Sequence, residues 1–576
     1  MLLVRRLSLL AIVAGFISFS VSEALSAETP QELKKAMRLK KLEEFKKAAA
    51  EKKAAAEKKA APPVGPVYSG KKNPDIVTPL KPTLIGGKGD AAAVASMIDK
   101  EVNDRLATAK LTASPICDDS EFLRRVYLDI AGITPTADQA RKFLDNSASD
   151  KRAKLIDELL NSPRYAQRQT DIWNNLLIKK TSDNRKTDFT PFTKWLEGQF
   201  KANRPWNLLV SDMLTATGNA ETNPATGFFF SNTAVDKMTD EVGKLFLGQS
   251  IQCAQCHNHP FTDYQQTEYW ALAQFFFKTV AAGAKGGAGE VRETNGVRRG
   301  KNNELPESAK TVTPTFLRST TPKVSENEMY RPVLAKWLSS PTNPFLAKAM
   351  VNRTWAEFFG VGIVNPVDDM RPDNKPSHPV LLEQLAADFA ANDFDVKHLI
   401  RSICNSQTYQ RSSRSVAGNT DAEDVLFARM TLKVMTPEQL YDSLVNVTGA
   451  TGANAGRKVG GAGKGAGATS REGFTTFFLS GAETANTTEY ESGIPQALRL
   501  MNAKALNTSR IVQQYAKSSD PAKGIEELYL STVSRRPTTG EVARLTDFLK
   551  TNSNTADTWG DILWVLLNSS EFTMIR

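Results

Sequence analysis

Residues 118–128 read Asp118-Asp119-Ser120-Glu121-Phe122-Leu123-Arg124-Arg125-Val126-Tyr127-Leu128, a stretch typical of a helix and its start. Asp is a residue type that caps helix N-termini, and the apolar residues after it recur at helical spacing. The same spacing returns at 155–160 (ended by Pro163), at 382–389 after Ser377-His378-Pro379, and at 562–567. Only three short apolar runs, 228–230, 311–317 and 474–479, are candidates for strands. The sequence therefore predicts a mainly α fold with minor β.

Composition divides the chain into two predicted helical domains and several connecting segments. Residues 62–90 are rich in Pro, Gly and Lys, and residues 281–310 are rich in Gly, Lys and Asn, as is usual for linkers. We predict a linker at 62–90, a first helical domain at 91–280, a second linker at 281–327 and a second helical domain at 328–576. The Gly- and Ala-rich residues 449–470 are predicted to form a loop within the second domain.

The N-terminal residues indicate export. Arg5 and Arg6 precede an apolar run at 7–19, and small residues follow, which is the pattern of a cleaved signal peptide at 1–27. The run is too short for a comfortable membrane span. We therefore expect a location in the periplasm or cell envelope. Residues 28–61 form a Lys/Ala/Glu-rich arm that resembles a solvated helical spacer.

The arm also carries most of the net charge. Residues 31–61 contain eleven Lys or Arg against five Glu, and so +6 of the formal net charge of +10. An alternative to the spacer is a tether to an anionic envelope polymer or lipid. Binding to nucleic acid is not expected of an exported chain.

The motif that points to a function is Cys253-Ala254-Gln255-Cys256-His257-Asn258-His259. Cys-x-x-Cys-His is the pattern of covalent c-type haem attachment. Cys253 and Cys256 would form the thioether bonds, and His257 would bind the haem iron, with His259 as a possible alternative. Export agrees with this interpretation, because c-type haem is normally attached outside the cytoplasm.

Three other interpretations of the motif remain open. The same residues could bind zinc, with further ligands from elsewhere in the chain. The two cysteines could be a redox-active pair or a structural disulfide. The two cysteines outside the motif, Cys117 and Cys404, are expected to be unpaired, with Cys404 buried on an apolar helix face.

A second polar cluster lies in the second half. Asp368, Asp369, Asp373 and His378 fall within eleven residues and could bind a divalent ion or perform acid–base chemistry. The alternative is a structural loop, in which Ser377 caps a helix and Arg371 pairs with an acid. Arg353 is likewise expected to anchor a carboxylate. No nucleophile-elbow, dinucleotide-binding or phosphate-loop motif is present, and we leave open whether the protein is an enzyme.

The order of motifs resembles a known family. Residues 122–135, Leu247-Gly248, Cys253 to His257 and the aromatic run 269–276 are similar to the planctomycete-type cytochrome c-like domain. The second half is similar to its companion C-terminal domain of unknown function. The matching residues there are Asn343-Pro344, 351–355, 359–364, 376–379, 395–397, Tyr409-Gln410, 493–502, 534–537 and Glu571-Phe572.

This resemblance implies an exported bacterial protein whose activity is not established. With the motif, it indicates an exported c-type haem protein acting in electron transfer or redox chemistry with an unknown partner. The alternative is a cell-envelope binding or scaffold protein with a structural or zinc-bound Cys/His segment. Related sequences have acids where this chain has Asn258 and Thr262, and Asp263 is a possible substitute. Candidates for a sixth iron ligand are Met238, Met329, Met370, His378 and His398, none in the loop of a small cytochrome c, so we expect an unusual or open sixth position.

Overall fold

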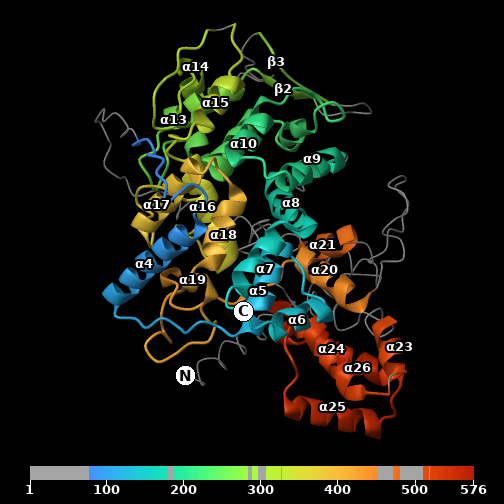
Figure 1. Ribbon diagram of the computed structural model, residues 1–576. Coiled ribbons are helices and arrows are strands. Elements are labelled where there is room, and N and C mark those ends of the chain that lie inside the picture. Colours follow the sequence, from blue (N-terminus) through green and yellow to red (C-terminus); the bar gives the residue numbers. More distant parts are fainter. Residues whose placement is uncertain are drawn as a thin grey trace, which may run out of the picture. The chain divides into compact units, whose positions relative to one another are not determined.

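Helices make up most of the described chain, as the sequence predicts (Figure 1). The computed structural model describes residues 77–178, 187–282, 289–295, 306–325, 327–449, 471–479, 510–517 and 519–576, which all belong to the compact unit Pro74–Arg576. The predicted signal peptide, the arm, most of the first linker and nearly all of the Gly/Ala loop lie outside the described residues. Among the described helices, none combines the length and the apolar character that crossing a membrane requires.

The first segment of the chain, residues 91–280, is a series of helices joined by short turns. Asp118 caps α5 as predicted, accepting hydrogen bonds from the N–H groups of Ser120 (3.0 Å) and Glu121 (2.9 Å). In chain order the elements are α4 (Ala91–Ala109), α5 (Asp119–Val126), the π-helical turn η1 (Tyr127–Ala131), α6 (Ala137–Asp145), α7 (Lys151–Leu160), α8 (Pro163–Leu177), α9 (Thr190–Lys201), α10 (Trp206–Thr215), η2 (Pro224–Thr226), α11 (Gly227–Ser231), α12 (Val235–Glu241), the π-helical turn η3 (Val242–Phe246), the 3-10 turn η4 (Gln252–Gln255), α13 (Gln266–Ala273) and η5 (Gln274–Phe276).

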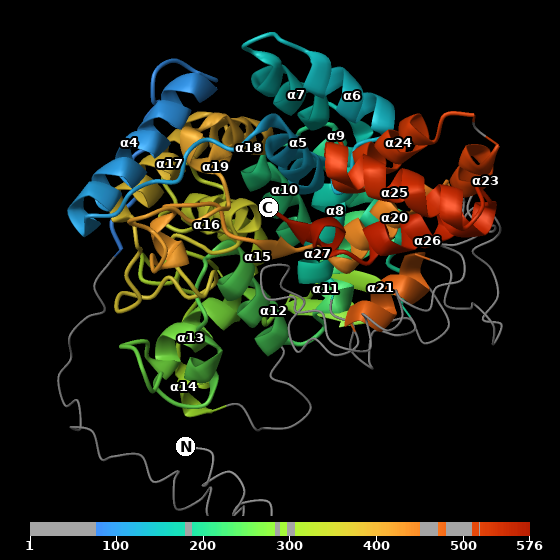
Figure 2. The ribbon, with the colours of Figure 1, turned by 90° about the horizontal axis from the view of Figure 1, so that it is seen from below.

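The second segment, from residue 281 to the end of the chain, is also mostly helical. Helix α4 of the first segment packs against three helices of the second, α17, α18 and α19 (Figure 2). Its elements are α14 (Glu307–Thr311), α15 (Arg331–Leu338), α16 (Leu346–Phe359), α17 (Pro379–Ala391), α18 (Val396–Asn405), α19 (Gln407–Gln410), η6 (Asp424–Leu426), α20 (Pro437–Thr448), α21 (Arg471–Leu479), α23 (Arg510–Ala516), α24 (Pro521–Val533), α25 (Thr539–Thr551), α26 (Ala556–Leu567) and α27 (Ser570–Thr573).

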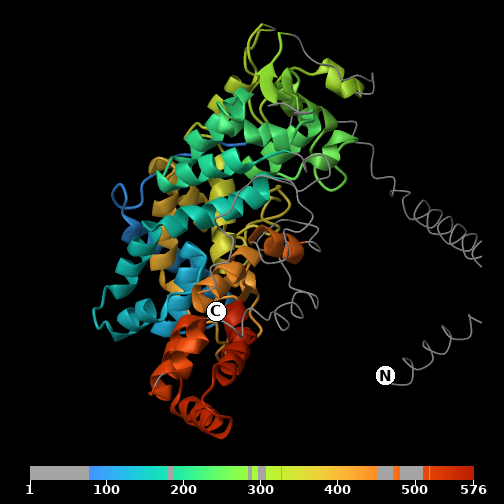
Figure 3. The ribbon, with the colours of Figure 1, turned by 90° about the vertical axis from the view of Figure 1, so that its right-hand side faces the viewer.

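The described strands are few and short. Strands β1 (Gly218–Asn219), β2 (Thr279–Ala282) and β3 (Glu290–Glu293) form an antiparallel sheet in the order β1-β3-β2, so part of the predicted 281–327 linker is a strand. Strand β4 (Lys433–Val434) pairs with β5 (Met574–Ile575). Helices α24–α26 lie at the opposite end of this unit from β2 and β3 (Figure 3).

The three strand predictions are wrong. Residues 228–230 lie in α11, residues 474–479 lie in α21, and 311–317 contain the end of α14 followed by irregular chain. The three phenylalanines of α11 are all buried. A helix buried on every side shows a continuous apolar run, which periodicity cannot distinguish from a buried strand.

The two sequence segments share one hydrophobic core. Phe122 and Trp206 from the first segment and Trp355 from the second are fully buried within it, and apart from Leu530 of α24 its buried members lie at or before Met430. A second core is formed by α20 and the helices after it, which pack around Trp559 together with Leu128 of η1. Most of the buried residues after 430 therefore belong to the second core, with Leu530 and Leu128 crossing between the two, and the division of the sequence at 281–327 stays a prediction about sequence segments.

Two buried arginines of helix α5 connect the first segment to the C-terminal part of the chain. Arg124 donates hydrogen bonds to the carbonyl oxygens of Thr532 (2.8 Å) and Phe572. Arg125 donates to those of Tyr409 (2.6 Å) and Arg576 (2.5 Å). Burial lowers the pKa of Arg124 to about 9. The residues around β5 are thus held by the first segment as well as by β4.

The two cysteines outside the motif behave as predicted. Cys117 and Cys404 are free and buried, with 4% and 0% of their surface exposed. Burial raises the pKa of both thiols, which keeps them protonated and unreactive.

Candidate functional site

The Cys-x-x-Cys-His motif lies on one turn at the surface. The 3-10 turn η4 spans Gln252–Gln255, and Cys256 and His257 follow it directly. Residues three apart nearly eclipse one another in such a turn, so Cys253 and Cys256 lie on the same side of it. Both thiols are free and exposed, whereas Ala254 between them is buried. The turn therefore presents two unpaired thiols to solvent.

Helix α13 holds the backbone of this turn. The side-chain amide of Gln266 donates hydrogen bonds to the carbonyl oxygens of Gln255 (3.1 Å) and Cys256 (2.8 Å). The indole N–H of the buried Trp270 also donates to the carbonyl of Gln255, at 3.0 Å. The backbone N–H of Gln266 donates to Oδ1 of Asn258 at 3.0 Å. Helix α13 therefore fixes the backbone of the motif, while the side chains of Cys253, Cys256 and His257 stay exposed to solvent.

The two histidines of the motif differ in the nitrogen that they leave available. Nδ1 of His257 lies 2.6 Å from the carbonyl oxygen of Asn258, which can only accept, so Nδ1 carries the proton and Nε2 keeps its lone pair. Nδ1 of His259 instead accepts a hydrogen bond from the N–H of Phe261 at 3.3 Å, so the proton of a neutral ring lies on Nε2. His257 is exposed and His259 is partly buried. His257 is therefore the better placed of the two to bind a metal.

A loop from the second half of the chain borders the segment that leads into the motif. The N–H of Met370 donates to the carbonyl of Gly248 at 2.9 Å, and the amide of Gln249 returns a hydrogen bond to the carbonyl of Met370 at 2.9 Å. The hydroxyl of Ser250 donates to the carbonyl of Asp368 at 3.0 Å. The two polar clusters that the sequence indicates separately therefore lie next to each other.

Burial lowers the pKa of His259, and the positive charge of Arg371 lowers it further. The carboxylates of Asp369 and Asp373 act in the opposite direction. All three charges belong to the loop from the second half, which shows that this loop reaches the electrostatic surroundings of the motif.

The carboxylates of that loop are used in ion pairs. Asp368 binds the buried Arg353, as the predicted carboxylate anchor requires. Arg371 lies 3.1 Å from Asp369 and 3.6 Å from Asp373, which confirms the predicted pairing of this arginine with acids. In the described part of the chain, no three His, Cys, Asp or Glu side chains are grouped to hold a metal ion. These contacts are those of a structural loop.

His378 lies apart from these carboxylates. It is buried against Phe427, and its Nδ1 lies 3.0 Å from the hydroxyl of Ser377. Burial and the nearby charge of Arg105 lower its pKa to about 4. The prediction that Ser377 caps helix α17 is wrong, because His378 holds the N-cap position and the Ser377 hydroxyl donates to the carbonyl of Ile363 instead. The chain turns sharply before Pro379, and the serine is thereby directed back to the loop.

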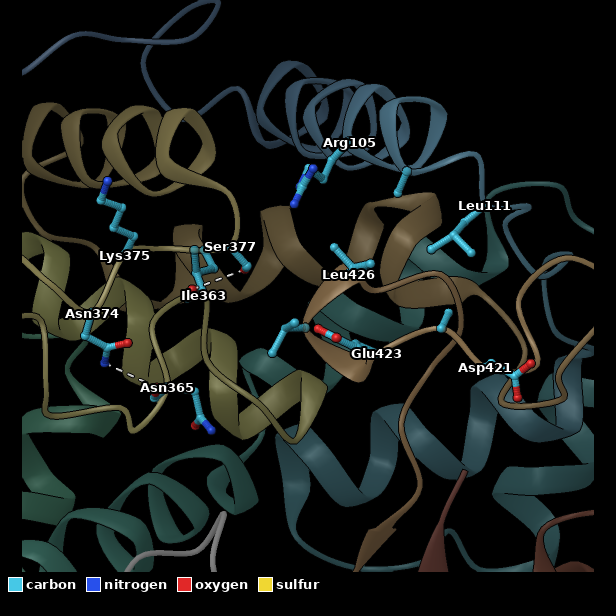
Figure 4. Close-up of a pocket in the computed structure, with 13 residues that line it drawn as sticks. Arg105, Leu111, Ile363, Asn365, Asn374, Lys375, Ser377, Asp421, Glu423 and Leu426 are labelled. Atoms are coloured by element: carbon cyan, nitrogen blue, oxygen red, sulfur yellow. Dashed lines mark hydrogen bonds between the residues drawn. The ribbon is translucent and has the colours of Figure 1, made fainter.

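A pocket of about 570 Å³ lies between helix α4, the loop before α17 and the η6 region (Figure 4). Helix α4 contributes Arg105, the loop before α17 contributes Lys375 and Ser377, and the η6 region contributes Asp421 and Glu423. Its apolar lining includes Leu111, Ile363 and Leu426. These groups can hydrogen-bond a polar molecule, and none of them belongs to the Cys-x-x-Cys-His motif.

Two family models match the chain in succession. Residues 97–281 match the family described as PSCyt2, protein of unknown function (DUF1549). Residues 330–472 match the family described as PSD1, protein of unknown function (DUF1553). The chain carries a PSCyt2 segment followed by a PSD1 segment. This confirms the predicted resemblance to the planctomycete cytochrome c-like domain and its C-terminal companion. No curated protein and no solved structure matches the chain.

Asn258 and Thr262 stand at the two positions where the resemblance leads us to expect acids. Asn258 accepts the N–H of Gln266, and the hydroxyl of Thr262 accepts the N–H of Tyr264 at 3.3 Å, so both residues stabilise the loop. Asp263 pairs with Arg318 at 2.5 Å. That pairing does not place the Asp263 carboxylate on either histidine of the motif.

The candidates for a sixth iron ligand are mostly engaged elsewhere. Met238 is fully buried in the core, and His398 is buried with Nε2 at 3.0 Å from Asp388. His378 is buried beside Phe427, and Met329 is exposed. Met370 is the candidate whose backbone contacts the segment before the motif, but its sulfur lies against Gly248, 3.1 Å from where a Cβ of that residue would be. An open sixth position stays a prediction.

Two groups of residues around the motif were missed by reasoning from sequence. Gln266 and Trp270 follow the motif within one helical stretch, so their closeness along the chain was an available signal. The contacts of Gly248, Gln249 and Ser250 with the PSD1 segment join residues about 120 positions apart. No local sequence pattern predicts a contact between residues so far apart in the chain.

Proposed function

We propose that this chain is an exported c-type haem protein acting in electron transfer or redox chemistry of the cell envelope. Cys253 and Cys256 are the attachment residues, and His257 is the iron ligand. The observation that supports this most directly is the geometry of the motif turn. It holds two free thiols on one side and an imidazole whose Nε2 keeps its lone pair.

The donor set fits the group. Covalent attachment needs two thiols close together and an imidazole immediately after them. An iron-binding histidine usually donates its other ring N–H to a carbonyl or carboxylate, and Nδ1 of His257 does so to Asn258. When bound, haem supplies one-electron redox chemistry. The exposure of all three residues means that a group held there remains accessible to a redox partner, whose identity is unknown.

The residues around the motif have positioning roles in this proposal. Gln266 and Trp270 fix the carbonyl oxygens of the turn and keep its backbone from rearranging. Ser250 ties the incoming chain to the PSD1 segment. Each of these contacts leaves the two thiols and Nε2 of His257 outside the hydrogen-bond network, ready to react.

The alternative is an envelope binding or scaffold protein with a zinc-bound or structural Cys/His segment. Zinc in structural sites takes four protein ligands, so Cys253, Cys256 and His257 would need a fourth ligand from elsewhere in the chain. A disulfide between Cys253 and Cys256 needs no further ligand and remains the simplest competing state. A tether through residues 31–61 to an anionic polymer or lipid is part of either proposal and falls outside the described residues.

Expression of the full chain with haem-attachment machinery tests the proposal. We expect a red protein that keeps its colour after denaturation, gains the mass of one haem and gives a pyridine haemochrome spectrum. Cys253→Ala and Cys256→Ala should each reduce attachment. Cys117→Ala is the matched control, because this cysteine is buried away from the motif. A colourless protein with stoichiometric zinc, or with a Cys253–Cys256 disulfide, would contradict the proposal.

A further inference from the structure

The pocket between α4, the loop before α17 and the η6 region lies where the two family segments meet. Its volume of about 570 Å³ is within the range of about 300–1,000 Å³ that small-molecule sites usually have. Arg105 belongs to the PSCyt2 segment, whereas Lys375 and Glu423 belong to the PSD1 segment. Ligand sites occur preferentially at such junctions. The Cys-x-x-Cys-His motif does not line this pocket, so a ligand there is independent of the proposed haem attachment.

The charged side chains of the pocket do not bind one another. Arg105 on α4 and Lys375 before α17 are cations, and Asp421 and Glu423 are acids of the chain that leads into η6. Among the described residues, none of these four exposed side chains has a hydrogen bond or an ion pair within 4.0 Å. Figure 4 shows Arg105 pointing from α4 towards the segment that carries Glu423. The pocket thus holds unpaired charges of both signs.

The walls that carry these charges are fixed by other groups. The side-chain amide of Asn419 donates to the carbonyl of Thr112 (2.9 Å) and to the hydroxyl of Ser114 (2.9 Å), which ties the chain before η6 to the chain after α4. The hydroxyl of Ser377 donates to the carbonyl of Ile363 at 3.1 Å and holds a second wall. These backbone contacts need none of the four charged side chains, which are left to contact a ligand.

Charges of both signs select a ligand that also carries both. An anion would be repelled by Asp421 and Glu423, and a cation would be repelled by Arg105 and Lys375. The guanidinium of arginine matches the planar fork of a carboxylate, and a glutamate accepts hydrogen bonds from an ammonium group. Leu426 adds apolar surface to the pocket, against which an aliphatic side chain of the ligand can pack.

We propose that this pocket binds a short peptide with free ends, whose carboxylate contacts Arg105 and whose ammonium group contacts Glu423. Arg105 and Glu423 form no direct ion pair, so a ligand with two separated charges can bridge them. A dipeptide separates its charges by more bonds than a free amino acid does, and its side chain can lie against Leu426. A free amino acid has the same chemistry in a smaller molecule, and the experiment distinguishes the two.

The test is a calorimetric titration of the full chain with glycyl-leucine, its N-acetyl form, its C-terminal amide and free leucine, at constant ionic strength. We expect saturable binding of glycyl-leucine. Blocking either end should weaken binding by about tenfold or more, because each block removes one charge-assisted contact. Arg105→Gln should bind the free peptide and the amide equally. Glu423→Gln should bind the free and acetylated peptides equally.

A second readout reports where the peptide binds. His378 is buried close enough to Arg105 for the charge of that arginine to act on its ring. In protein labelled with carbon-13 histidine, saturating glycyl-leucine should shift the ring resonance of His378, which His378→Gln assigns. The resonance of the exposed His257 should stay in place, because this residue lies outside the pocket.

Lys100→Gln and Asp424→Asn are the matched controls. Lys100 lies on α4 and pairs with Asp104 at 2.7 Å, and Asp424 follows Glu423 and lies 3.6 Å from Arg429. Neither lines the pocket, so both variants should bind as the unmodified chain does. Absence of saturable binding, equal binding of the blocked peptides to the unmodified chain, or tighter binding of free leucine would overturn the proposal. Binding that leaves the His378 resonance unmoved would place the peptide elsewhere and overturn it as well.

Discussion

Replacing His378 by Gln should flatten the dependence of stability on acidic pH. The pKa of His378 falls from an ordinary 6.5 to about 4, first because the ring is buried and then because Arg105 is near. The folded chain therefore resists protonation of this ring, whereas the unfolded chain takes up the proton below about pH 6.5. The stability associated with the neutral ring is complete above that pH and is lost as the pH falls towards 4.

The magnitude follows from the difference in proton affinity. Each pKa unit corresponds to about 1.4 kcal/mol, so His378 should remove about 2 kcal/mol of stability between pH 7.5 and pH 5, and about 3.4 kcal/mol once the pH is well below 4. A glutamine cannot take up a proton and so lacks this contribution. The buried position of the ring, with 4% of its surface exposed, means that solvent screens the effect little.

Urea unfolding at pH 7.5, 6 and 5 measures this effect. The loss of unfolding free energy over that range should be smaller in His378→Gln than in the unmodified chain by about 2 kcal/mol, whatever the two stabilities are at pH 7.5. His257→Gln controls for removing an exposed imidazole. Parallel stability curves for His378→Gln and the unmodified chain would refute the reasoning.

Three further predictions concern packing, a buried charge and the motif. Gly524→Ala should lower stability by about 1–3 kcal/mol in urea unfolding, because its Cβ would lie 2.7 Å from the buried ring of Trp559; an unchanged midpoint would show that the ring can shift. Lys433→Met should cost about 3–5 kcal/mol by leaving Asp129 buried and unpaired, and adding Asp129→Asn should recover part of that loss; no recovery would mean that the lysine acts mainly through the carbonyls of α16. Gln266→Ala should lower the yield of haem attachment, because its amide binds the carbonyls of Gln255 and Cys256, while Thr267→Ala at the next, exposed position of α13 should not; equal yields would remove the positioning role of Gln266.

Local features of the fold could be predicted from the sequence because they depend on neighbouring residues. The cap at Asp118 and the buried stripe of α26 both follow from side chains a few positions apart. The phenylalanines at 228–230 could not be assigned in this way, because burial on all sides removes the alternation that distinguishes a strand from a helix. The helix there is set by packing in the core.

In the candidate site, too, features set by neighbouring residues could be predicted, whereas contacts between distant residues could not. Spacing within seven residues predicted that the two thiols and His257 act together, which stays a prediction; the structure places Cys253 in η4 and Cys256 and His257 directly after it. Of the two interpretations of residues 368–378, the contacts favour the structural loop, because Asp368 pairs with Arg353 and the ring of His378 is buried beside Phe427. The contact between Met370 and Gly248 depends on tertiary packing of residues far apart in sequence.

That last contact has a consequence for anyone who wishes to divide the protein. Cutting the chain at the boundary between the two family matches would leave the Gly248 carbonyl and the Ser250 hydroxyl without the partners that they have in Met370 and Asp368. It would also strip the main core of Trp355 and the helices around it. A fragment made from the first match alone should therefore be poorly soluble, and the two matches are better expressed, exchanged between relatives or redesigned as a single piece.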